Sequence, residues 1–113
     1  MDFARRHADA FALGAITLIA LMLRIAAARG GLWLDEAWSA VFAREVATPL
    51  GVFLSVNHDN NHHLNTLWLQ LVGWGAPPMV QRGLSIECGA AAVPLAAAIL
   101  KPFGRGSALA GTV

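Results

Sequence analysis

Charged side chains are scarce in this chain of 113 residues: they make up 13% of it, against about 25% in ordinary soluble domains. Tyrosine is absent, and a single cysteine, Cys88, excludes an internal disulfide. Cys88 lies among apolar residues, which predicts a small packing residue there rather than a nucleophile. A net charge of +1 and the lack of a basic cluster exclude nucleic acid as a partner.

Apolar residues are correspondingly abundant and make up 57% of the chain. A small soluble domain must cover a large surface with polar groups, and this chain has too few of them. The composition therefore indicates a membrane protein, with the lipid bilayer as its first partner. No internal repeat, glycine-rich phosphate loop or CxxC motif is present.

Three apolar runs are near the length needed to cross a bilayer core, which takes about 17–25 helical residues. They predict an all-α, polytopic membrane protein with about three transmembrane helices, at about 10–28, 64–80 and 83–100. The first run follows Arg5 and Arg6, a start that would also suit a secretory signal peptide. Its length and the apolar sequence after it favour a transmembrane helix.

The basic residues predict how the chain crosses the membrane. Arg5 and Arg6 place the N-terminus in the cytoplasm of a multi-pass protein of the cytoplasmic membrane, with an outer loop at 29–63. Three spans then put Arg82 inside but Lys101 and Arg105 outside, against the positive-inside tendency. Either the third run does not span in this simple way, or later spans fix the topology.

The outer loop 29–63 combines apolar residues at mixed spacing with polar ones. This pattern predicts one or two short amphipathic helices along a membrane face. Pro49 is expected to begin the second helix, with Thr48 as its N-cap.

Two neighbouring acids, Asp35 and Glu36, follow the first apolar run within "GLWLDEAWSA". They form either a solvated interfacial pair flanked by Trp33 and Trp38, or a general base at the rim of a membrane cavity. In the second case partial desolvation would raise the pKa of a carboxyl toward working pH. Spacing alone does not choose between the two.

A second polar cluster, "VNHDNNHH", precedes the run at 64–80. In a helical turn His58 and His62 would share one face, and with Asp59 they could hold a divalent metal. Polar residues that cap the following helix explain the same cluster. Arg24, late in the first run, either extends its guanidinium to the interface or faces inward to hold an anion.

Taken in order, these segments resemble the N-terminal part of the GT-C membrane glycosyltransferases, the superfamily of protein O-mannosyltransferases and lipid A aminoarabinose transferases. The resemblance rests on "LMLRIAAA", "LWLDEAWSA", "NHHLNTLWLQL" and "QRGLSIECGAAAVPLAAAIL", and it covers essentially the whole chain. Two positions depart from the family pattern. His63 stands where proline is usual, and Gly83 separates Arg82 from Leu84.

The resemblance implies transfer of a sugar from a polyprenyl-phosphate donor to an acceptor hydroxyl outside the cytoplasmic membrane. It implies that Asp35 is the general base, with Glu36 supporting it or orienting the acceptor, and that His62 and Arg24 lie near the donor phosphate. No cofactor is certain, although a divalent metal at His58 and Asp59 stays open.

Enzymes of this kind have many more spans than this chain. We therefore expect residues 1–113 to be an N-terminal fragment that is inactive alone and partners the remaining part of the enzyme. The alternative is a small, non-catalytic integral membrane protein that binds a membrane partner.

Overall fold

The computed structural model describes residues 2–58 and 62–113, and every regular element in these ranges is a helix. The predicted all-α class is therefore confirmed. The chain divides into two compact units. Unit 1 is formed by Met1–Ala27 and Ser85–Val113, and unit 2 by Ala28–Leu84.

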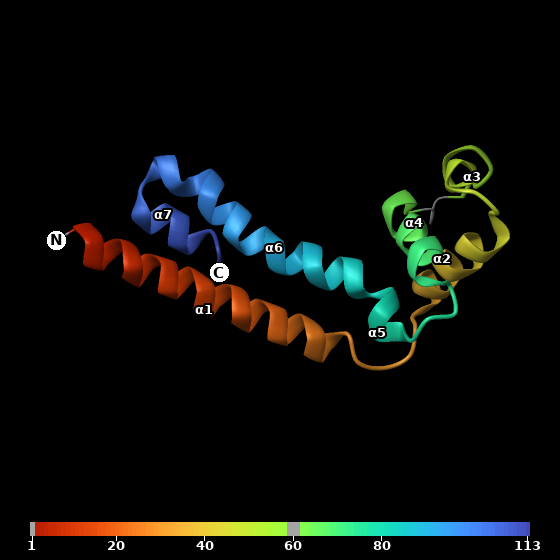
Figure 1. The fold of residues 1–113 in the computed structure, drawn as a ribbon, viewed down its shortest axis with the longest axis horizontal. Helices are drawn as coiled ribbons and strands as arrows, with labels where there is room; N and C mark the ends of the chain where they lie inside the picture. The colour runs from red at the N-terminus through yellow and green to blue at the C-terminus, as the bar shows by residue number, and fades with distance from the viewer. Residues whose placement is uncertain (1, 59–61) are drawn as a thin grey trace. The chain divides into compact units, whose positions relative to one another are not determined.

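Unit 1 contains the two long helices. Helix α1 covers Asp2–Ala27, and helix α6 covers Gly83–Leu100, its first two residues belonging to unit 2. A 3-10 turn, η1 (Lys101–Phe103), then leads into the short helix α7 (Arg105–Ala110). Figure 1 shows α7 turned back beside the end of α6, where a Cβ on Gly111 would collide with Leu100.

Two helices among the described residues are long and apolar enough to cross a membrane: Phe3–Ala27 and Gly83–Phe103. None of the most apolar window of the first helix is buried, and only 6% of that of the second. Helices this apolar would be mostly buried if they formed the core of a soluble protein. By their length and composition, the two helices suggest a membrane protein.

The segment 64–80, expected as a third span, does not form one long helix. Helix α4 (His63–Val72) has ten residues, which reach about 15 Å, half of a bilayer core. It ends where Gly73 adopts a φ of 96°, a conformation that favours glycine. After a turn, Pro77 and Pro78 start the four-residue helix α5 (Pro78–Gln81). Three spans are thus not confirmed.

The outer loop forms two short helices as predicted. Helix α2 covers Leu34–Glu45, and helix α3 covers Pro49–Leu54. Thr48 caps α3, because its Oγ1 accepts a hydrogen bond from the Gly51 N–H at 3.2 Å. Pro49 is the first helical residue, where its missing N–H costs nothing.

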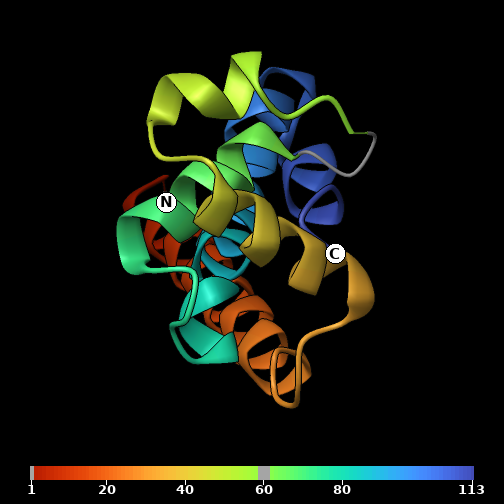
Figure 2. The same ribbon diagram turned by 90° about the vertical axis from the view of Figure 1, so that its right-hand side faces the viewer.

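Unit 2 is built around α4, which packs against α2 and α3 (Figure 2, with α2 in gold and α4 in green). Its core is small and includes polar groups. The buried apolar residues of these three helices are Phe42, Ala43, Val52 and Leu69, and the buried polar residues of the unit are Ser39, Thr66 and Gln81. Gln81 holds the 73–77 turn, because its Nε2 donates to the carbonyls of Trp74 and Ala76 at 3.1 and 2.7 Å.

Candidate functional site

The two acids of "GLWLDEAWSA" lie in the first turn of α2, and the structure gives them different surroundings. Glu36 is bound by Arg82 through both carboxylate oxygens. Arg82 Nε donates to Oε1 at 2.7 Å, and Nη2 donates to Oε2 at 2.6 Å. This fork geometry is the strongest kind of side-chain pairing, because two charge-assisted hydrogen bonds fix its orientation.

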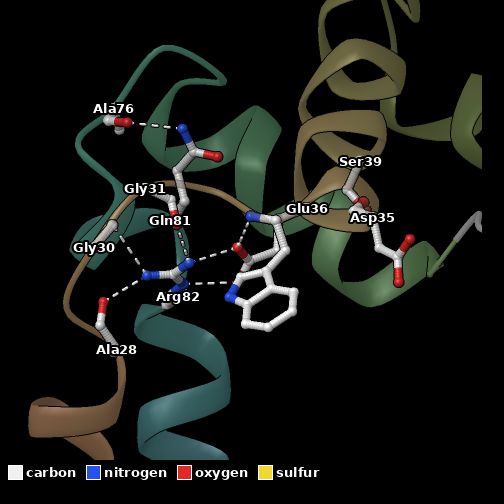
Figure 3. A network of polar contacts seen from close by, with 10 residues as sticks. Ala28, Gly30, Gly31, Asp35, Glu36, Ser39, Ala76, Gln81 and Arg82 are labelled. Atoms are coloured by element: carbon white, nitrogen blue, oxygen red, sulfur yellow. Dashed lines mark hydrogen bonds and ion pairs between the residues drawn. The ribbon is translucent and has the colours of Figure 1, made fainter.

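Arg82 also binds the backbone that follows α1. Its Nη1 donates to the carbonyls of Ala28 and Gly30 at 2.6 and 3.3 Å, and its Nη2 donates to that of Gly31 at 2.7 Å. Figure 3 shows the guanidinium enclosed by these carbonyls and by Glu36. Gly30 has a φ of 110°, which only glycine adopts without strain, so the chain can curl around the guanidinium there. We refer to Arg82, Glu36, Ala28, Gly30 and Gly31 as the arginine clasp.

The clasp joins the two ends of unit 2. Ala28 comes directly after the last residue of α1, and Arg82 directly before the first residue of α6. Only 11% of the Arg82 side chain and 33% of the Glu36 side chain are exposed. The clasp is therefore screened from solvent much better than an ordinary surface ion pair.

The clasp shifts the pKa values of its two charged members. The hydrogen bond from Arg82 lowers the pKa of the Glu36 carboxyl, against a smaller opposite effect of burial. The backbone N–H of Trp33, which donates to Oε2 at 2.8 Å, lowers it further. In turn the hydrogen bond to Glu36 raises the pKa of Arg82. Both groups are thus charged at neutral pH, and Glu36 is not poised as a proton acceptor.

Asp35 lies one position earlier on α2 and is exposed. Figure 3 shows its carboxylate directed away from Arg82 and the rest of the clasp. Its backbone carbonyl accepts a hydrogen bond from the buried Ser39 hydroxyl at 3.2 Å, which fixes this turn of the helix. A carboxylate near a helix N-terminus is also favoured by the helix dipole. Of the two acids, Asp35 is therefore the more exposed.

The histidines do not share a helix face as the sequence suggested, because α4 begins only at His63. His58 stacks on α2, with its ring centroid 5.8 Å from Trp38 and 5.2 Å from Phe42. His63 stacks on Phe53 of α3 at 5.1 Å. His62 is exposed at the N-cap of α4, and its side chain makes no capping hydrogen bond.

The predicted metal site is not formed by the described residues. Within 2–58 and 62–113 no group of three or more His, Cys, Asp or Glu residues could hold a metal ion. Asp59, the second ligand expected, lies outside the described residues.

Arg24 belongs to unit 1, whereas Asp35, Glu36 and the histidines at 58, 62 and 63 belong to unit 2. It is exposed, and its guanidinium rests on Gly89 of α6, where a Cβ would collide with it. The absence of a side chain at Gly89 thus leaves room for the arginine to cross between the two long helices.

An open groove with a volume of about 610 Å³ lies at the C-terminal ends of α2 and α4. None of the predicted site residues lines it. Arg44 is its charged member, with Cζ 5.6 Å from the centroid of the Trp74 ring. Gln70 crosses its floor and donates from Nε2 to the Val46 carbonyl at 2.8 Å.

Sequence reasoning placed Arg82 on the opposite side of the membrane from Glu36. The groove was missed altogether, because its residues come from separated segments and match no short motif. The glycines at 30 and 31 were the only sign that the chain curls after α1.

Comparisons with protein-family models, curated proteins and solved structures gave no match to this chain. The site must therefore be interpreted from its own geometry.

Proposed function

We propose that this chain is part of an integral membrane glycosyltransferase, with Asp35 as the general base that deprotonates an acceptor hydroxyl. The donor is a polyprenyl-phosphate sugar, as the resemblance of the ordered segments implies. The observation that carries the proposal is the division of the acid pair. Glu36 is held in the arginine clasp, which leaves the adjacent Asp35 exposed at the first turn of α2.

In this mechanism the roles of the residues are separate. Asp35 removes the proton of the acceptor hydroxyl as the new C–O bond forms and the bond to the phosphate breaks. Glu36 and Arg82 are positioning residues, because they fix the turn that carries Asp35. His62, exposed at the start of α4, would donate a hydrogen bond to the leaving phosphate.

We further propose that the protein crosses the cytoplasmic membrane twice, through Phe3–Ala27 and Gly83–Phe103, with unit 2 on the outer side. The contact between Glu36 and Arg82 supports this topology, because a span over 64–80 would separate them by the bilayer. Two spans return the C-terminal part to the cytoplasm. Arg5, Arg6, Lys101 and Arg105 then share the cytoplasmic side, in agreement with the positive-inside rule.

Sugar transfer in native membranes tests the catalytic proposal. Membranes that contain the protein as its cell produces it are given radiolabelled polyprenyl-phosphate mannose or aminoarabinose, and label on membrane acceptors is counted. Asp35→Asn should lower transfer by about 10²–10⁴-fold, the usual contribution of a general base. The amount of protein in the membrane should not change, because Asp35 is outside the clasp.

Glu36→Gln is the matched control. It should reduce the amount of folded protein, with transfer per folded molecule lowered much less than by Asp35→Asn. Full transfer by Asp35→Asn would contradict the proposal, as would the absence of transfer from both donors in wild-type membranes.

A non-catalytic membrane protein is the second candidate. It is favoured by the position of the groove, which Asp35 does not line. In that case Asp35→Ala leaves the binding of a membrane partner intact, and the clasp serves only the fold.

A further inference from the structure

The groove at the C-terminal ends of α2 and α4 has the size of a ligand site. Its volume of about 610 Å³ lies within the range of about 300–1,000 Å³ typical of small-molecule pockets. Ala47, Leu67 and Leu71 contribute apolar surface, and Leu71 is 79% exposed. Such a wall is suited to a hydrocarbon chain.

Two polar side chains line the groove, and one of them is placed to receive a ligand. Arg44 lies against the face of Trp74, which orients the guanidinium without neutralising its charge. Gln70 uses its amide nitrogen on the Val46 carbonyl, but its Oε1 is buried without a hydrogen-bond partner among the described residues. Because this oxygen has almost no accessible surface, Arg44 is the polar group of the groove that a ligand can contact.

The position of unit 2 in the chain indicates that the ligand is a lipid. Both ends of the unit continue directly into helices long enough to cross a membrane. All four tryptophans of the chain, Trp33, Trp38, Trp68 and Trp74, belong to unit 2. Tryptophan concentrates at the interface between water and lipid, where its ring and its N–H are both satisfied.

We propose that the groove binds an anionic phospholipid, for which phosphatidylglycerol is the probe. One acyl chain lies along the apolar wall, and the phosphate pairs with Arg44, the only formally charged residue among those that line the groove. The proposal rests on the topology given above and not on sugar transfer.

Quenching of tryptophan fluorescence by brominated lipids tests this site in the full chain in detergent micelles. Trp74 is the tryptophan that lines the groove, so the difference between wild type and Trp74→Phe isolates its emission. Brominated phosphatidylglycerol should half-saturate this quenching at an about fivefold lower concentration than brominated phosphatidylcholine, as one partly exposed ion pair allows.

Three variants make the test specific. Arg44→Gln should remove the preference for phosphatidylglycerol, whereas Arg29→Gln, an exposed arginine of unit 2 outside the groove, should keep it. Ala47→Phe should fill the groove and abolish quenching by both lipids, with helix content by circular dichroism unchanged.

Equal quenching by the two lipids would overturn the proposal. So would an equal loss of preference in Arg29→Gln and Arg44→Gln. Trp74 that neither lipid quenches would show that protein, and not lipid, covers the groove. None of these readouts uses a sugar donor, so their failure is distinct from a failure of the catalytic proposal.

Discussion

Arg82 Nη2 lies 2.6 Å from Glu36 Oε2, although 46 residues separate the two in the chain. One side chain thereby closes unit 2, because the same guanidinium holds the carbonyls of the segment that leaves α1. The contact also distinguishes Glu36, which Arg82 binds, from its exposed neighbour Asp35.

Arg82→Ala should destabilise unit 2 by about 2 kcal/mol, because it leaves three carbonyls and a partly buried carboxylate without their donors. Arg82→Lys should recover less than half of this loss, since an ammonium cannot reproduce the fork. Thermal unfolding in detergent, followed by circular dichroism, measures both. Arg29→Gln is the control and should leave the midpoint unchanged.

Limited proteolysis would show which segment of unit 2 Arg82→Ala destabilises. In Arg82→Ala the segment 28–33 should be cut faster than in wild type, while α1 stays protected in lipid. Unchanged cutting of that segment would show that the clasp does not hold it.

Acid should weaken the clasp in a defined window. The pKa of Glu36 is lower in the folded protein than its ordinary value of 4.5. Its contribution to stability is therefore fully present above pH 4.5 and is lost as the pH falls through the lowered folded pKa. Unfolding midpoints measured downward from pH 7 should fall more steeply below pH 4.5 in wild type than in Glu36→Gln. Parallel profiles for the two proteins would contradict this.

Features of the fold that depend on neighbouring residues could be predicted from the sequence, whereas contacts between distant positions could not. The N-cap at Thr48, Pro49 as the start of α3, and the helical class follow from neighbouring residues and were predicted correctly. The pairing of Arg82 with Glu36 depends on how α4 packs against α2, which no local pattern encodes. The catalytic role of Asp35 and the donor-phosphate roles of His62 and Arg24 stay predictions.

The segment 64–80 shows most clearly where prediction from the sequence failed. Its apolar composition suits a span, although Gly73, Gly75, Pro77 and Pro78 are residues that commonly end a helix. It is divided by the backbone at Gly73 and by the burial of Thr66 and Gln81 inside unit 2. Polar residues that are buried within a small protein core look in sequence like the rare polar residues of a transmembrane helix.

Gly83, one of the two departures from the family pattern, has a steric explanation. A Cβ at this position would lie 3.0 Å from Trp68 Cζ2, and the Trp68 ring is fixed by its N–H donating to the Val80 carbonyl at 3.0 Å. Gly83→Ala should therefore displace the ring and cost about 1 kcal/mol. The expected readouts are a lower unfolding midpoint and a shift of tryptophan emission.

Gly75→Ala is the matched control, because no atom lies within 4 Å of the added Cβ and Gly75 has no positive φ. It should leave both the emission and the midpoint unchanged. A midpoint for Gly83→Ala equal to that of wild type would mean that Trp68 can move aside freely.

The two-span topology differs from three spans at two positions, and labelling of single cysteines distinguishes them. With Cys88→Ala as background, Ala76→Cys lies in unit 2 and Ala110→Cys in α7. Two spans place position 76 outside and position 110 in the cytoplasm, whereas three spans bury position 76 within the span 64–80 and place position 110 outside. A membrane-impermeant maleimide added to intact spheroplasts should therefore label position 76 and not position 110. Labelling of both positions in lysed cells shows that each thiol is reactive. The reverse pattern in intact cells would require the Glu36–Arg82 pair to be broken in the membrane, because its members would then lie on opposite sides of the bilayer.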